Sequence, residues 1–107
     1  MTDKSNRKAE LLSSPVEHID ITAFDGRPLI DAWEKMSFTS RDAARAARIL
    51  EAAVADPDCS VILTLAGSTS AGGCMDVWRD MVRHNMVDAI VSTGAAIVDM
   101  DFFEALG

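Results

Sequence analysis

The chain lacks the features that mark several large classes of protein. Ten Lys and Arg stand against seventeen Asp and Glu, and a net charge of −7 repels phosphate backbones, which argues against nucleic-acid binding. The two cysteines, Cys59 and Cys74, form no CxxC pair, so neither a metal site nor a disulfide framework is indicated. No apolar run is long enough to cross a bilayer, and the polar N-terminus has no signal-peptide core. We therefore expect a cytoplasmic protein that binds no nucleic acid, membrane or metal.

The length and composition fit one domain with a flexible arm in front of it. Of the 107 residues, 49% are hydrophobic, which is enough for a single modest core. Residues 1–14 are polar and predict a solvated arm, and residues 15–107 predict an α/β unit. "VEHIDI" alternates as a short strand does, and "RPLIDAWEKM" predicts a helix with Pro28 in its first turn.

The middle of the chain predicts a long helix and then a buried strand. Thr39 is a candidate cap with Asp42 three residues on, and Arg48 falls on the polar face. The predicted buried stripe consists of Ala43, Ala46, Ala47, Leu50, Ala53 and Val54. "DPDC" ends this helix, and the continuous apolar run "SVILTLAG" is typical of a strand that is buried on both faces.

A second helix and a second strand complete a βαβ unit, which places the protein in the α/β class. The helix starts near Met75 and should stop near Asn85 with a left-handed cap. Its inner face is predicted from Met75, Val77, Trp78, Met81 and Val82. "DAIVSTGAA" follows as the second strand, for which parallel pairing is strongly favoured, and "DMDFFEAL" predicts the start of another helix.

Both strands end in small and hydroxyl residues, in "AGSTSAGG" and in "STGAA". Ligands of parallel sheets gather at these ends, where glycines admit a ligand to the backbone and a helix N-terminus favours an anionic group such as pyrophosphate. The alternative is that the glycines only turn the chain. The GxGxxG fingerprint is missing, and Gly73 stands where a P-loop needs its lysine. Spacing alone thus indicates a ligand loop of undetermined kind.

The stretch "RHNMVDAIVSTGAAIVDMDFFEALG", together with "LAGSTSAGG", resembles the deoxyhypusine synthase family, and most of all its bacterial deoxyhypusine synthase-like branch. "HNMVD" is the most specific part. The resemblance implies the N-terminal portion of a Rossmann-like, three-layer parallel-sheet domain. It also implies an NAD-dependent homotetramer that moves the aminobutyl group of spermidine to an acceptor amine. The acceptor is a protein lysine in the type members, or putrescine in homospermidine-forming relatives.

The resemblance also assigns site residues. The NAD-contacting positions fall on Gly67, Ser68, Thr69, Ser70, Ala71, Thr93, Gly94 and Ala95, and Asp99 faces both cofactor and polyamine. The catalytic lysine of the family lies in its C-terminal part, so we expect it beyond Gly107 and expect this chain alone to be inactive. A truncated, non-catalytic α/β binding module is the alternative. His84 is predicted to cap its helix, and valine at Gly72 to strain the turn and abolish NAD binding.

Overall fold

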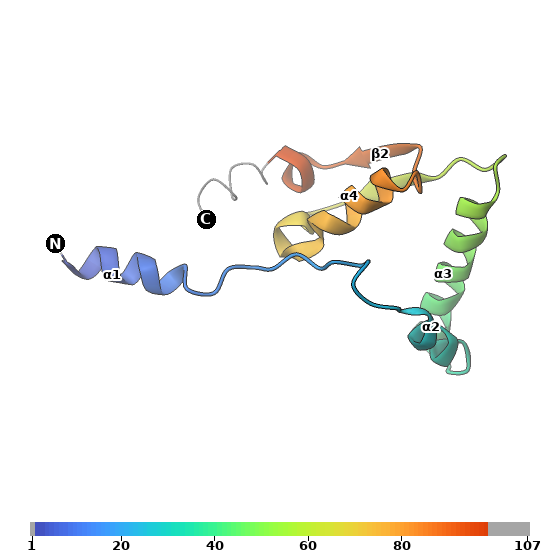
Figure 1. Ribbon diagram of the computed structural model, residues 1–107, viewed down its shortest axis with the longest axis horizontal. Coiled ribbons are helices and arrows are strands. Elements are labelled where there is room, and N and C mark those ends of the chain that lie inside the picture. Colours follow the sequence, from blue (N-terminus) through green and yellow to red (C-terminus); the bar gives the residue numbers. More distant parts are fainter. Residues whose placement is uncertain (1, 99–107) are drawn as a thin grey trace.

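The computed structural model describes the backbone of residues 2–98 and the side chains from Lys4 onward. The molecule is elongated, with extents of 60 × 31 × 24 Å. Helix α1 (Thr2–Leu11) projects from one end, and the paired helices α2 (Arg27–Glu34) and α3 (Phe38–Ala55) lie at the other end (Figure 1). A strand–helix–strand unit lies between them.

This unit consists of strand β1 (Ile62–Leu65), the wide helical turn η1 (Ser70–Cys74), helix α4 (Met75–Arg83) and strand β2 (Ala89–Ser92). The strands pair in parallel, from Ile62 opposite Ala89 to Leu65 opposite Ser92. The predicted parallel βαβ unit is therefore confirmed, and the fold is a small α/β arrangement. Residues 2–98 hold two strands of sheet and not the three layers implied by the family resemblance.

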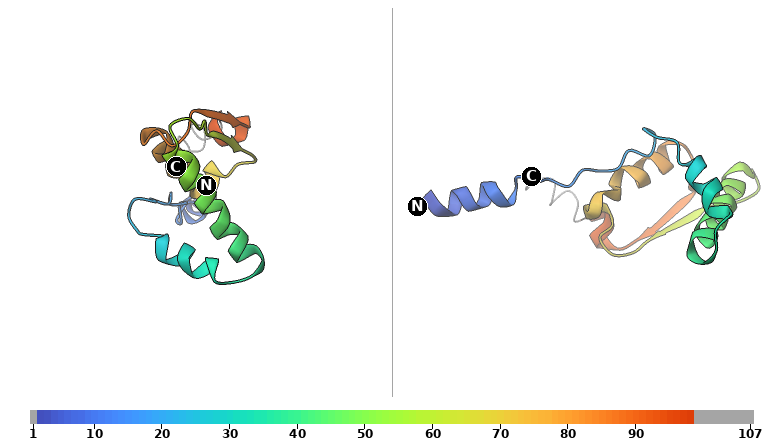
Figure 2. Two further views of the ribbon diagram at one scale, coloured as in Figure 1. Left: turned by 90° about the vertical axis from the view of Figure 1, so that its right-hand side faces the viewer. Right: turned by 90° about the horizontal axis from the view of Figure 1, so that it is seen from below.

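Among residues 2–98, other elements cover only one face of the strand pair. Helix α4 lies along the strands (Figures 1 and 2), and Leu65 and Met81 are buried. On the opposite face Ile62 and Val91 remain 62% and 61% exposed. The prediction that the apolar run around β1 is buried on both faces is wrong for this structure, because no described element covers that second face.

Helices α2 and α3 pack against each other. Pro28 lies in the first turn of α2, as predicted, since its missing N–H costs nothing there. Helix α3 begins at Phe38 with Ser37 at its cap position and no capping side chain, so the cap predicted at Thr39 is wrong.

Ala44, not Ala43, is the fully buried residue of α3. Ala46, Leu50 and Val54 of the predicted stripe are exposed, while Ala47 and Ala53 are half-buried. Arg48, expected on the polar face, is also half-buried, because α2 covers α3 from a different side than the stripe predicted.

The predicted end of α4 is confirmed in detail. Asn85 adopts a left-handed conformation with φ +53°. Its N–H donates to the Val82 carbonyl at 3.1 Å, and the N–H of Met86 donates to the Met81 carbonyl at 2.9 Å. These two bonds form a Schellman motif, which satisfies carbonyl groups that the helix end would otherwise leave free. Of the predicted inner face, Met81 is buried but Val82 is 51% exposed.

The segment before α2 is extended but is not a strand. The N–H of Ile19 donates to the Gly73 carbonyl at 2.9 Å, and this single bond attaches the segment to η1. The strand predicted for "VEHIDI" is therefore wrong, since one hydrogen bond makes no ladder. The chain then turns at Asp20, whose carboxylate accepts from the N–H and the hydroxyl of Thr22. The residues of the predicted arm contain helix α1, whose described side chains are exposed.

Candidate functional site

The two strand ends lie side by side, as the sequence predicts. We call residues 67–73, which run into η1, the first loop, and residues 93–96, of which 94–96 already begin a helical segment, the second loop. The hydroxyl of Thr93 donates to the Gly67 carbonyl at 2.8 Å, and the N–H of Thr93 donates to the Leu65 carbonyl at 3.2 Å. In the other direction, the hydroxyl of Ser70 donates to the Ala96 carbonyl at 2.6 Å. Hydroxyl groups and backbone carbonyls thus link the two loops at the carboxyl edge of the sheet.

The predicted site residues differ in exposure. Gly67, Ser68, Thr69, Thr93 and Gly94 are exposed, and Ala71 and Ala95 are half-buried. Ser70 is fully buried, and its only proton is donated to Ala96, so its hydroxyl has no proton left to donate to a ligand. The family resemblance assigned Ser68, Thr69 and Ser70 alike to the NAD-contacting positions. The structure separates the exposed Ser68 and Thr69 from Ser70, which joins the loops.

The glycines of the first loop have two different roles. Gly73 has φ +97°, and a Cβ there would lie 2.8 Å from the Glu17 carbonyl oxygen, so only glycine fits. Gly67 also has a positive φ, of +67°, but lies in open space. Gly72 has ordinary backbone angles and nothing within 4 Å of a Cβ. The expectation that a side chain at Gly72 strains the turn is therefore wrong, and that constraint belongs to Gly73.

The open side of the first loop has the character of a cradle for an anionic group. A Cβ at Gly67, Gly72 or Gly94 would meet no atom within 4 Å, so a ligand can approach the backbone at all three positions. Within residues 2–98, no acceptor bonds the N–H groups of Ser68 and Thr69. Free amides ahead of a helix favour negative charge.

The remaining candidates lie elsewhere. Asp99 falls outside the described residues. His84 is the exposed C-cap of α4, and its backbone N–H donates to the Asp80 carbonyl at 3.0 Å, in line with the predicted structural role. His18 is half-buried. Between Thr2 and Val98, no three His, Cys, Asp or Glu side chains could together hold a metal ion. None of the helices in that range is long and apolar enough to span a bilayer.

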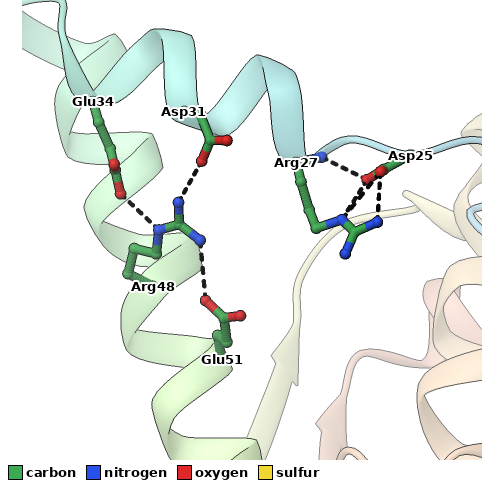
Figure 3. A network of polar contacts seen from close by, with 6 residues as sticks. All are labelled: Asp25, Arg27, Asp31, Glu34, Arg48 and Glu51. Carbon is green, nitrogen blue, oxygen red and sulfur yellow. Dashed lines mark hydrogen bonds and ion pairs between the residues drawn. The ribbon is translucent and has the colours of Figure 1, made fainter.

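A cluster of charged side chains joins α2 to α3 (Figure 3), and the sequence analysis did not predict it. Arg48 of α3 contacts Asp31 at 2.5 Å and Glu34 at 2.6 Å, both from α2, and Glu51 at 3.2 Å. Hydrogen bonds to Glu34, Glu51 and Asp31, in that order of effect, raise the pKa of Arg48 above its usual range. The acidic residues of α2 could have indicated an ion-pair cluster. Their partner, Arg48, could not be identified from the sequence, because it depends on how the two helices pack.

An open apolar groove of about 410 Å³ lies beside this cluster, and Ile30, Leu50, Val54 and Met86 are among its lining residues. None of these residues belongs to the first or second loop. The groove therefore forms no part of the candidate ligand site.

The family model and the relatives that match this chain name the same family. Residues 28–107 match the family described as deoxyhypusine synthase. The chain is 67% identical to the deoxyhypusine synthase-like protein of Caulobacter vibrioides over 96% of its own length, and 67% identical to that of Coxiella burnetii over 94%. A probable deoxyhypusine synthase of Methanopyrus kandleri is 43% identical over 59% of the chain. The chain spans 28% of the length of the first two relatives and 21% of the third. No solved structure matches the chain significantly.

Proposed function

The chain belongs to the deoxyhypusine synthase family, and from this premise we propose that the whole protein transfers an aminobutyl group from spermidine to an acceptor amine. The bond between the secondary nitrogen of spermidine and its four-carbon arm breaks, and 1,3-diaminopropane leaves. The arm then forms a bond to the acceptor nitrogen, which is a protein lysine in the primary proposal.

The observation that carries the proposal is the meeting of two small-residue loops at one sheet edge, held together in both directions by hydroxyl groups. We propose that this edge binds part of an NAD molecule. Its exposed backbone at Gly67 and Gly94 suits a dinucleotide, as do the N–H groups of Ser68 and Thr69, which bond no acceptor among residues 2–98. Bound NAD would supply a hydride acceptor when the amine is oxidised before the transfer and would return the same hydride after it, so that the overall transfer is redox-neutral.

Other parts of the proposal concern the whole protein. We infer that the strand pair described here is one part of a Rossmann-like, three-layer sheet. Asp99 would pair with an ammonium group of the polyamine, since a carboxylate is the natural partner for that charge. The whole protein would be a cytoplasmic homotetramer with its catalytic lysine outside this chain.

The test is an assay of the protein at the full length that its gene encodes, with spermidine, NAD and candidate acceptors. Release of 1,3-diaminopropane that depends on NAD is the expected result. No release with any acceptor, from protein shown to be folded, would contradict the enzymatic proposal and favour a non-catalytic binding module. The mass of the second product identifies the acceptor, because transfer to putrescine gives homospermidine and transfer to a protein adds the aminobutyl mass to that protein.

A further inference from the structure

The two loops of the candidate site are joined by hydroxyl groups that donate in opposite directions. Thr93 of the second loop donates to Gly67, and Ser70 of the first loop donates to Ala96. We propose that Ser70 and Thr93 are positioning residues that fix the separation of the loops, so that both reach one NAD molecule. This inference rests on the proposed function, because it describes how the same site is held in shape.

Burial supports this assignment for Ser70. Ser70 is 0% exposed, and Ala96, whose carbonyl accepts the hydrogen bond, is 1% exposed. A hydroxyl buried without a partner loses the hydrogen bonds that it makes in water, so this bond persists whether or not a ligand is bound. Ser70 therefore acts on a ligand through the position of the second loop and not through direct donation.

Thr93 makes the contacts from the second loop toward the first. Its N–H bonds the Leu65 carbonyl at the end of β1, and its hydroxyl bonds the Gly67 carbonyl two residues later. One residue of the second loop thus bonds both the end of β1 and the start of the first loop. Ser92, directly before it, donates its hydroxyl to the Thr93 carbonyl at 3.0 Å and so makes no connection between the loops.

These contacts define matched variants. Ser70→Ala removes a hydroxyl that joins the loops, and Ser92→Ala removes one that does not. Thr93→Val removes the hydroxyl and keeps the shape, and Thr93→Ser keeps the hydroxyl and removes the methyl group. Thr64→Val is the same change as Thr93→Val at an exposed position of β1 whose hydroxyl bonds no described residue.

The experiment measures NAD affinity by calorimetry and amide hydrogen exchange without NAD, in protein of the full length that its gene encodes. Ser70→Ala and Thr93→Val should each raise the NAD dissociation constant about two- to tenfold. Ser92→Ala and Thr64→Val should bind like the parent, and Thr93→Ser, which keeps the hydroxyl, should bind NAD more tightly than Thr93→Val. Each of the two weakened variants should also exchange faster in both loops, although only one loop is changed, and this is an effect that local destabilisation would not produce.

Parental NAD affinity in Ser70→Ala and Thr93→Val, or faster exchange confined to the substituted loop, would overturn the inference. Because Thr93 is exposed, the comparison of Thr93→Val with Thr93→Ser decides the matter even if Ser70→Ala does not fold. A parent protein that binds no NAD would contradict the proposed function. In that case the exchange measurements would still test whether the two hydroxyl groups hold the loops together.

Discussion

Gly73 is the most tightly constrained of the glycines that the structure describes. It combines φ +97° with a carbonyl oxygen of Glu17 only 2.8 Å from where a Cβ would stand. We expect Gly73→Ala to lower the free energy of unfolding by about 1–3 kcal/mol, because an alanine must adopt an unfavourable conformation and displace backbone. Urea denaturation followed by circular dichroism measures the change.

Gly72→Ala is the matched control for that prediction. It adds the same methyl group one position earlier, where the backbone angles are ordinary and the space is open. Its effect on stability should stay within about 0.5 kcal/mol. Equal losses in the two variants would show that the contact between Gly73 and residue 17 does not constrain the protein in solution.

Asp25, just before α2, should make the folding stability of the protein depend on pH. The side chain of Arg27, followed by its backbone N–H, lowers the pKa of Asp25 from 3.8 to about 2 by hydrogen bonding to the carboxylate. A depressed folded-state pKa means that the stabilisation is fully present above pH 3.8 and is lost as the pH falls toward about 2. The melting-temperature difference between the parent and Asp25→Asn should therefore be constant above pH 5 and shrink below pH 4, roughly.

Titration of the Asp25 carboxyl group by NMR provides a direct measurement. Arg27→Gln should return its pKa toward 3.8, because the first cause of the shift is removed. A parent carboxyl group that titrates near 3.8 would contradict the ion pair seen in the structure.

At the scale of elements, the α2–α3 pair depends on one arginine that faces three carboxylates. Arg48→Met keeps the aliphatic stem and leaves Asp31, Glu34 and Glu51 to repel one another. We expect a lower melting temperature at low salt and a smaller difference from the parent at 1 M NaCl, where the Debye length is about 3 Å. Thermal melts at two salt concentrations measure this dependence.

Arg45→Met is the appropriate control, because Arg45 lies on the same helix, is exposed and forms no ion pair with another described residue. Arg45→Met changes the net charge by the same amount as Arg48→Met and should lower the melting temperature less. A loss in Arg48→Met that does not respond to salt would indicate that packing of the stem, and not charge, holds α2 on α3.

Elements governed by local rules were predictable from the sequence. Pro28 in the first turn of α2 and the left-handed Asn85 after α4 both follow from backbone geometry of a few residues. The adjacency of the two loops also followed, because parallel strands bring their carboxyl ends to the same edge.

The errors arose where the outcome depends on distant partners. The alternation in "VEHIDI" is typical of a strand, but its backbone finds one bond to Gly73 and no neighbouring strand. The face of α3 was misjudged because Arg48 is drawn inward by the acidic residues of α2. The burial of Ser70 was likewise not readable, since its partner Ala96 lies 26 residues away in sequence.

At the scale of the molecule, the uncovered face of the strand pair should determine how the 107-residue chain behaves in solution. Large apolar side chains exposed together bind hydrophobic dyes and promote association. Replacing Ile62 and Val91 by threonine keeps β-branched side chains on that face. We expect lower binding of an anilinonaphthalene dye and an unfolding free energy within about 0.5 kcal/mol of the parent.

Leu63→Thr provides the contrast, because Leu63 points to the covered face and is half-buried. It should lower stability by about 1–3 kcal/mol. A comparable loss in the Ile62 and Val91 variant would mean that this second face is packed in solution.

The bond between Ile19 and Gly73 has a consequence for the synthesis of the chain. Its donor leaves the ribosome well before its acceptor, since about half of this sequence separates the two residues. At about 5–20 residues per second, the wait is roughly 3–10 s. During that time the N-terminal segment has no contact with η1 and is accessible to chaperones and proteases, so the early residues take their place only after the first loop has been translated.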